Sequence, residues 1–132
     1  MKNILKLGLS MSFAVYSSVA LCADVYVVVN NSSTLSADDI KDVFTGEKQV
    51  DHGVKITPLD NLSLKTDFVD KVLHVTPEKY AGIWVKKGFR DGLNPPAAKS
   101  SDLDVIAVVK ASPGAVGYVS QEPAGVKVLK KY

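Results

Sequence analysis

The sequence has one cysteine and two histidines among its 132 residues. The cysteine, Cys22, lies in an N-terminal segment that we expect to be removed. The remaining chain would then have no disulfide, no thiol nucleophile and no cysteine ligand for a metal. The histidines, His52 and His74, are isolated and lack the carboxylate–histidine spacing of a zinc site. We therefore predict neither a metal site nor a cofactor.

The sequence also lacks the usual signals of an enzyme. No Gly-x-Ser-x-Gly motif positions a nucleophilic serine, and the only thiol would be lost with the N-terminal segment. Two carboxylate pairs, Asp38/Asp39 and Asp102/Asp104, each begin a predicted helix, where negative charge stabilises the helix dipole. We predict that the protein is not an enzyme.

An excess of charge of one sign is missing as well. The formal net charge is +2, from sixteen basic and fourteen acidic residues. Lys2 and Lys6 lie in the N-terminal segment, and removing these two from the sixteen leaves fourteen of each sign. A neutral domain with interspersed charges lacks the electrostatic footprint of a nucleic-acid-binding protein. We interpret the weakly basic end, KVLKKY, as a solvated tail and predict no nucleic-acid partner.

The first 23 residues, MKNILKLGLSMSFAVYSSVALCA, differ from the rest. Two lysines precede a short apolar stretch, and small residues come before Asp24, which is the layout of a cleavable secretory signal peptide. A membrane-spanning helix needs about 20 apolar residues, and this stretch is shorter and interrupted by glycine and serine. We expect cleavage after Ala23 or, as a second site, Ala20, giving a periplasmic protein with no membrane span after cleavage.

Cys22 at the end of this segment raises the question of a lipid anchor. A lipid-bearing cysteine normally follows a small residue, whereas Leu21 precedes this one. We therefore favour simple cleavage without lipidation. Residues 24–132 would then form a single small domain, in agreement with the usual range of domain sizes.

Apolar periodicity and capping residues predict alternating strands and helices. The run VYVVVN, for example, is too apolar for a surface strand and predicts a buried one. The predicted elements are a strand at 25–30, a helix from Ser36 to Gly46, a turn at 51–53, a strand at 54–59, a helix at 63–74, a helix from Thr76 to Gly88, an extended connector at 89–99, a helix from Ser101 to the break at Pro113-Gly114, and strands at 115–120 and 126–130.

The predicted helices carry apolar faces that we assign to the core. These residues are Ile40, Val43 and Phe44, then Tyr80, Ile83 and Trp84, then Leu103, Ile106 and Val109, with Val105 as a further candidate. We interpret Tyr80 and Trp84 as core residues rather than as a platform for a ligand. Buried strands that alternate with amphipathic helices indicate an α/β layered domain.

The segment TPLDNLSLKT, at 57–66, joins a predicted strand to a predicted helix. The first turn of a helix has unpaired N–H groups and partial positive charge, which suit phosphate or sulfate. Ser63 and Thr66 can add hydroxyl donors, Lys65 can add a full charge, and Asp60 can accept a hydrogen bond from a protonated ligand oxygen, which would favour a protonated oxyanion. The alternative is that Ser63 only caps the helix and Lys65 is solvated. The segment has no glycine that would allow close approach of the backbone to an anion, and this favours the alternative.

Two segments resemble a known family. TLSADDIKDVFTGEKQ resembles the LS…(D/E)L…IF.GK segment of phosphate-type substrate-binding proteins of ABC transporters, and SSDLDVIAVVKASPGAVGYVS resembles their later V..V…PGAIGYV segment. Between them, ITPLDNLSLKTDFVDKVL takes the place of the family's Arg-x-Asp-x-Ser-Gly-Thr phosphate loop and following helix. The resemblance covers most of residues 25–120. It implies an α/β fold, one lobe of a type II periplasmic-binding-protein-like fold with a mixed sheet flanked by helices.

The resemblance also implies the site residues of an oxyanion site. Asp60, Ser63 and Thr66 match positions of the family's loop, the first two when a gap is allowed. The loop's arginine has no counterpart near Leu59 or Asp60, and we infer that Lys65 replaces its charge. The loop's glycine is absent too, and the chain is long enough for about one of the family's two lobes.

From this resemblance we predict a periplasmic protein that binds phosphate or a similar oxyanion in connection with ABC transport, with an ABC permease as its partner. The alternative is a non-transport interaction or regulatory module that kept the lobe fold, lost the anion site and contacts an envelope partner protein. A third hypothesis is a homodimer in which two chains rebuild a two-walled cleft. Half a cleft alone should bind phosphate weakly.

Overall fold

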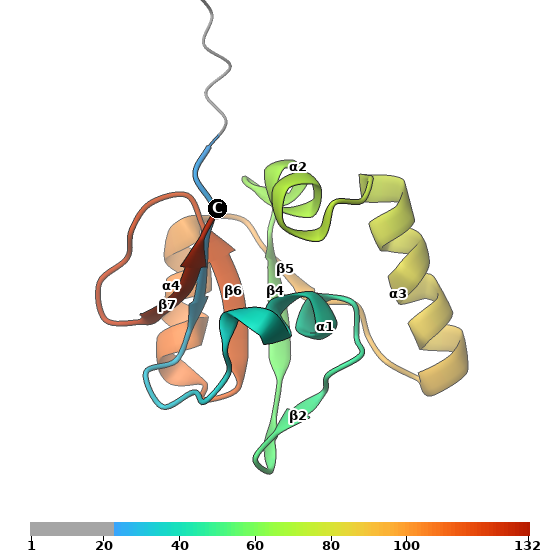
Figure 1. The fold of residues 1–132 in the computed structure, drawn as a ribbon, viewed down its shortest axis with the longest axis horizontal. Helices are drawn as coiled ribbons and strands as arrows, with labels where there is room; N and C mark the ends of the chain where they lie inside the picture. Colours follow the sequence, from blue (N-terminus) through green and yellow to red (C-terminus); the bar gives the residue numbers. More distant parts are fainter. Residues whose placement is uncertain (1–22) are drawn as a thin grey trace, which may run out of the picture.

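The protein's computed structural model describes residues 23–132 (Figure 1). The predicted signal peptide, including Ala20 and Cys22, lies outside the described residues apart from Ala23, so its cleavage stays a prediction. Residues 23–132 form a mixed sheet with helices packed around it. This arrangement confirms the predicted α/β fold class.

Five strands form the main sheet in the order β5-β4-β6-β1-β7. β4 runs parallel to β5 and β6, whereas β1 runs antiparallel to β6 and β7. The strands are β1 (Tyr26–Val29), β4 (Thr57–Asn61), β5 (Ala97–Lys99), β6 (Ala115–Val119) and β7 (Lys127–Lys131). A separate short hairpin pairs β2 (Val50–Asp51) with β3 (Val54–Lys55).

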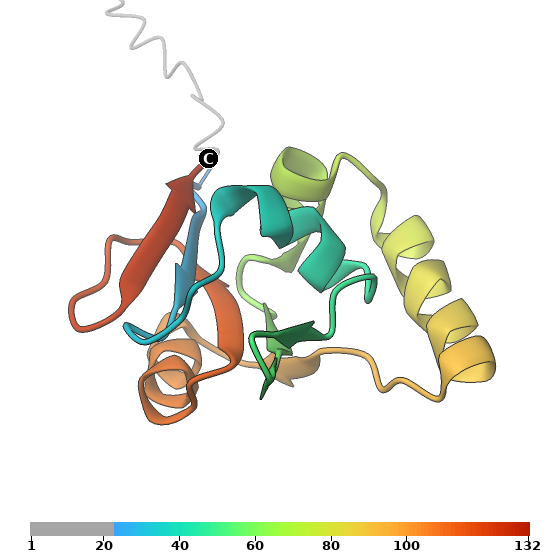
Figure 2. The same cartoon turned by 60° about the horizontal axis from the view of Figure 1, so that its bottom comes forward.

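Helices cover both faces of the main sheet (Figure 2). α4 (Asp102–Ala111) packs on one face, and the other helices lie on the opposite side, with α3 on the β5 side of the molecule. These other helices are η1 (Ala37–Asp39), α1 (Ile40–Phe44), α2 (Lys65–Phe68), the π-helical turn η2 (Val69–Leu73) and α3 (Pro77–Asp91).

β1 is buried on both of its faces, as its sequence predicted. Val27 and Val29 belong to the larger core cluster, whereas Val28 belongs to the cluster under α4. Because helices cover both sides of the sheet, the strand has no solvent-facing side that would require polar residues. The uninterrupted valine run is therefore a consequence of its central position.

Three aromatic rings lie at the centre of the larger core. Phe68 stacks on Tyr118 with ring centroids 3.8 Å apart and an interplanar angle of 4°. Phe44 meets both rings edge-on, at 4.6 Å and 5.7 Å. Since these side chains come from α2, β6 and α1, their packing connects both helices to the central sheet.

The segment SPGAVGYV leads into β6 and places glycine where backbones or helices approach closely. A Cβ atom at Gly114 would overlap the carbonyl oxygen of Lys55, and one at Gly117 would overlap the side chain of Val105. The two glycines therefore allow β3 and α4 to pack against this part of the chain. Both glycines of SPGAVGYV therefore have a packing role in this structure.

The predicted end of a helix at Gly88 is wrong. α3 continues to Asp91, and Gly92 ends it as the C-cap with a φ angle of 67°. The first part of the predicted connector is therefore helical. The connector also contains β5, which the sequence did not predict because residues 97–99 include no β-branched or aromatic residue. Parallel pairing with β4 supplies its hydrogen bonds.

The assignment of Leu103 to the core is also wrong, since 79% of this residue is exposed. Val105 and Val109, one helical turn apart, are fully buried and define the inward face of α4. Leu103 comes two residues before Val105, on roughly the opposite side of the helix. Ile106 is only partly buried at the border of the two faces.

The predicted strand at 54–59 is divided between two sheets. β3 completes a hairpin through His52 and Gly53, whose φ angles of 46° and 80° suit a two-residue turn. The chain changes partner at Ile56, and from Thr57 it pairs with β6 as β4. One apolar run therefore serves two different pairings.

The predicted helix at 63–74 is shorter than expected and changes its hydrogen-bonding period. It starts at Lys65, with Leu64 in the N-cap position, and its second half is the π-helical turn η2. Ser63 therefore does not cap this helix, which corrects the alternative interpretation of that residue. The helix ends at His74, which adopts a left-handed conformation with a φ angle of 56°.

Candidate functional site

The candidate site is built at the end of β4, where Asp60 and Asn61 follow each other. Both are buried, with exposed fractions of 3% and 0%. Because successive side chains of a strand point to opposite faces, Asp60 points toward tyrosines of the larger core, and Asn61 contacts the start of α4. β4 therefore places a polar group on each face of the sheet.

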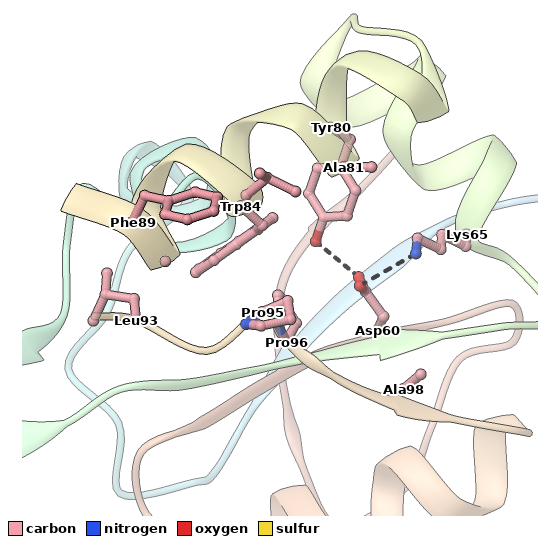
Figure 3. Close-up of a pocket in the computed structure, with 12 residues that line it drawn as sticks. Asp60, Lys65, Tyr80, Ala81, Trp84, Phe89, Leu93, Pro95, Pro96 and Ala98 are labelled. Carbon is pink, nitrogen blue, oxygen red and sulfur yellow. Dashed lines mark hydrogen bonds and ion pairs between the residues drawn. The ribbon is translucent and has the colours of Figure 1, made fainter. Parts of the chain in front are cut away.

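One carboxylate oxygen of Asp60 is held by two tyrosines. The hydroxyl groups of Tyr80, from α3, and Tyr118, from β6, donate hydrogen bonds to Oδ1 at 2.9 Å and 3.0 Å. Figure 3 shows Tyr80 pointing toward Asp60 from above the end of the strand. Sequence reasoning assigned Tyr80 to the core, and it is buried there, but it also donates a hydrogen bond to the candidate site.

The surroundings of Asp60 affect its protonation. Burial raises the pKa of the Asp60 carboxyl group, and the hydrogen bonds from Tyr80 and Tyr118 and the positive charge of Lys65 oppose that rise. Burial also raises the pKa of both tyrosine hydroxyls, and the neighbouring Asp60 carboxylate raises it further. The two tyrosines therefore remain hydrogen-bond donors at neutral pH.

Lys65, the first residue of α2, supplies the positive charge of the site. Its Nζ atom lies 3.8 Å from Oδ2 of Asp60, and 37% of its side chain is exposed. The same Nζ atom lies 5.5 Å from the centre of the Tyr80 ring, in a cation–π arrangement. The separation from Oδ2 exceeds a usual N–H···O distance. The pair therefore leaves donor and acceptor capacity for another group.

A polar network on the other face fixes the loop that follows β4. Oδ1 of Asn61 accepts hydrogen bonds from the N–H and O–H of Ser63 at 3.1 Å and 2.6 Å. Nδ2 of Asn61 donates to Oδ1 of Asp102 at 2.7 Å and to the carbonyl of Tyr118 at 3.1 Å. Oδ2 of Asp102 accepts from the N–H and O–H of Ser120 at 3.0 Å and 2.7 Å. Asp102, which was expected only to stabilise the helix dipole, therefore also links Asn61 to Ser120.

An open cavity of about 620 Å³ adjoins the Asp60–Lys65 pair (Figure 3). Its lining combines this polar end with an apolar surface from α3 and from the connector to β5. The apolar lining residues include Trp84, Val85, Phe89, Leu93, Pro95 and Pro96. Sequence reasoning missed this cavity; its signal was the pair Val85 and Phe89, which repeats the spacing of Tyr80 and Trp84 on an adjacent stripe.

The four residues predicted for the oxyanion site are only partly brought together. Asp60 and Lys65 form an ion pair and line the cavity. The hydroxyl of Ser63 donates to Asn61, and Thr66 is exposed beside a different depression that includes Asp70. Ser63 and Thr66 are absent from the lining of the cavity.

Two other properties of the described residues bear on the kind of site. Residues 23–132 contain no group of three or more His, Cys, Asp or Glu side chains placed to hold a metal ion. Within the same part of the chain, no helix has both the length and the apolar character that a membrane span requires. The charged residues that line the cavity, among those that the structure describes, are Asp60 and Lys65.

No protein-family model and no curated protein matches the sequence. Among solved structures, the fold is similar to that of an ABC-type phosphate transport receptor from Vibrio cholerae, with a TM-score of 0.54 and 16% sequence identity. The similarity covers 83% of this chain and 47% of the receptor chain, so this chain spans about half of the receptor's length. At this identity the likeness shows the fold alone: part of a periplasmic-binding-protein fold. Membership of the family stays a prediction.

Proposed function

We propose that the protein is a non-catalytic binding protein that captures phosphate or a similar oxyanion at the end of β4. The observation that carries this proposal is the pairing of the half-exposed Lys65 ammonium with the buried Asp60 carboxylate, 3.8 Å apart. The fold supports the proposal, because it resembles part of a phosphate transport receptor.

In the proposed mechanism, Lys65 donates a hydrogen bond to a negatively charged oxygen of the ligand. Oδ2 of Asp60 accepts a hydrogen bond from a protonated oxygen of the same ligand, which selects oxyanions that retain a proton. N–H groups in the first turn of α2 add partial positive charge. Ser63 and Thr66 lie outside the cavity lining and would add hydroxyl donors only to a ligand that extends to the start of α2, where Ser63 would exchange its bond to Asn61 for one to the ligand.

The biological setting belongs to the same proposal. A cleaved signal peptide would place the protein in the periplasm, where it would deliver the oxyanion to an ABC permease. This chain spans about half of the receptor's length, and the site proposed here is formed by one lobe. We therefore expect weaker binding than a closed two-lobed cleft provides.

A titration with inorganic phosphate tests the oxyanion site. Phosphate should raise the melting temperature, and at one hundred times the dissociation constant it should stabilise the fold by about 2.7 kcal/mol. A Lys65→Gln variant should lose this response, because the ligand's charge loses its partner. Lys41→Gln, which changes an exposed lysine on α1, serves as the matched control and should respond as the unmodified protein does. No response of the unmodified protein to millimolar phosphate, by calorimetry and melting, would refute the proposal.

A second function is favoured by one specific observation, the exposure of apolar side chains on α3. Phe89 is 89% exposed and Val85 58% exposed, which suits an interaction module with an envelope partner. A Ser63→Ala/Lys65→Ala double variant separates the two functions. Loss of phosphate-dependent stabilisation supports oxyanion binding. If the double variant melts as the unmodified protein does and still captures an envelope partner, the interaction module is supported.

A further inference from the structure

The cavity beside Lys65 is much larger than an inorganic oxyanion needs. Its volume of about 620 Å³ falls in the range of sites for small organic ligands. Of its twelve lining residues, Asp60 and Lys65 alone carry charge, and they lie together at one end (Figure 3). A bare phosphate held by this pair would leave most of the cavity filled with water.

The charged end offers one hydrogen-bond acceptor and one cationic donor. Oδ1 of Asp60 already accepts from Tyr80 and Tyr118, whereas Oδ2 has the Lys65 ammonium, at 3.8 Å, as its polar partner among residues 23–132. A head group that fits both must donate a hydrogen bond to Oδ2 and present a negative oxygen to Lys65. A phosphoryl head that carries one proton has both properties.

The rest of the cavity favours an apolar group. Val85 and Phe89 lie one turn apart on α3 and are 58% and 89% exposed, and Trp84 and Pro95 continue this wall. Apolar side chains that remain in water gain from being covered by an apolar ligand group, in proportion to the area covered. The cavity therefore joins a phosphoryl-binding end to an aromatic and aliphatic surface.

We infer that the ligand of this site is an organic phosphonate or phosphate monoester with an aromatic or bulky aliphatic substituent. Its phosphoryl head would lie between Asp60 and Lys65, and its substituent would cover Trp84, Val85 and Phe89. This inference rests on the proposed oxyanion function and specifies the class of its ligand.

A matched pair of ligands tests the inference on the purified protein. Phenylphosphonate and methylphosphonate share the head group and differ in the apolar substituent. Phenylphosphonate should bind at least about tenfold more tightly by calorimetry, which corresponds to about 1.4 kcal/mol. It should also change the fluorescence of Trp84, the only tryptophan in the sequence, which lines the cavity.

Variants locate the effect. A Val85→Ala/Phe89→Ala double variant should bind phenylphosphonate no more tightly than methylphosphonate, and its affinity for methylphosphonate should equal that of the unmodified protein. Both changes are at exposed positions, so the fold should be retained. Leu103→Ala removes an equally exposed apolar side chain from α4 and should change neither affinity. Equal affinities for the two ligands, or an advantage that the double variant retains, would overturn the inference while leaving the oxyanion proposal in place. Absence of binding by both phosphonates and by inorganic phosphate would instead refute the oxyanion proposal itself, and the inference with it.

Discussion

Asp60 shows how a single residue can combine structural and binding roles. Its carboxyl group is almost completely buried, yet each of its oxygens faces a donor: the two tyrosine hydroxyls at Oδ1 and the Lys65 ammonium at Oδ2. A buried carboxylate is stable only when such partners compensate for lost water. The same partners that stabilise Asp60 in the core hold it in position beside the cavity.

The raised pKa of Asp60 predicts a pH dependence of folding stability. Because burial raises the pKa above its usual value of 3.8, the folded protein binds this proton more tightly than the unfolded chain. The stabilisation from that proton is complete below pH 3.8 and is lost as the pH rises through the raised pKa. The hydroxyls of Tyr80 and Tyr118, which face Asp60, keep their protons over this window because burial raises their pKa.

An Asp60→Asn variant tests this pH dependence. The unmodified protein should lose stability relative to the variant as the pH rises from about 4 toward 7, so its unfolding free energy minus that of the variant should decrease. Urea unfolding at several pH values measures it. Asp39, whose pKa is lowered chiefly by the Ser36 N–H, has the opposite pH effect but is common to both proteins and cancels. Parallel stability curves would show that the Asp60 pKa is unchanged on folding.

At the scale of elements, the packing of α4 on the sheet depends on Gly117 in β6. The side chain of Val105 occupies the space where a Cβ atom at Gly117 would lie. β6 lies between β4 and β1 in the main sheet, so the strand cannot shift away without disturbing both neighbours. We therefore expect a larger residue at position 117 to destabilise the fold by pushing α4 away from the sheet.

Gly117→Ala should destabilise the fold by about 1–3 kcal/mol because of overpacking. Gly82→Ala is the matched control: a Cβ at Gly82, inside α3, meets nothing within 4 Å, and replacing a helical glycine should stabilise by about 1 kcal/mol. Chemical unfolding of both variants measures the contrast. A Val105→Ala change added to Gly117→Ala should recover part of the loss; equal stabilities of the two glycine variants would contradict this account of the packing.

Features that depend on residues adjacent in the sequence could be predicted from the sequence. Thr76 and Ser101 accept the expected N-cap hydrogen bonds from the N–H groups of Lys79 and Asp104, at 3.2 Å and 3.3 Å. The valine run of β1 likewise required a strand buried on both faces. These features depend on a few adjacent residues or on simple periodicity, so the sequence alone was sufficient.

Features that depend on distant neighbours could not be predicted in the same way. β5 has no strand-forming residues and exists because β4 offers a parallel edge. Ser63 was expected to cap a helix or bind an anion, but its hydroxyl bonds to Asn61, which the sequence analysis did not single out. The cavity arises only when α3 is placed against the connector to β5. Of the predicted site, the structure brings Asp60 and Lys65 together, and their role in binding stays a prediction.

At the scale of the whole molecule, the fold of this chain is similar to about half of a phosphate transport receptor chain. The phosphate transport receptor has roughly twice the length that this chain covers. The groups of the proposed site nevertheless come from one chain: Asp60 from β4, Lys65 from α2, and the apolar wall from α3 and the connector. A ligand could therefore be held on one side by this chain alone, with its other side exposed to water.

We expect the protein to bind its ligand as a monomer with one ligand per chain. The edges of the main sheet disfavour pairing between copies, because β7 carries Lys127, Lys130 and Lys131 and β5 has only three residues. Sedimentation equilibrium with and without phosphate or phenylphosphonate should give the mass of a single chain in both conditions, and calorimetry should give a stoichiometry of one. A doubling of the mass on ligand addition would instead indicate that two chains close around the ligand. In that case Lys65→Gln should abolish the doubling, because the ligand that joins the two chains would no longer be held.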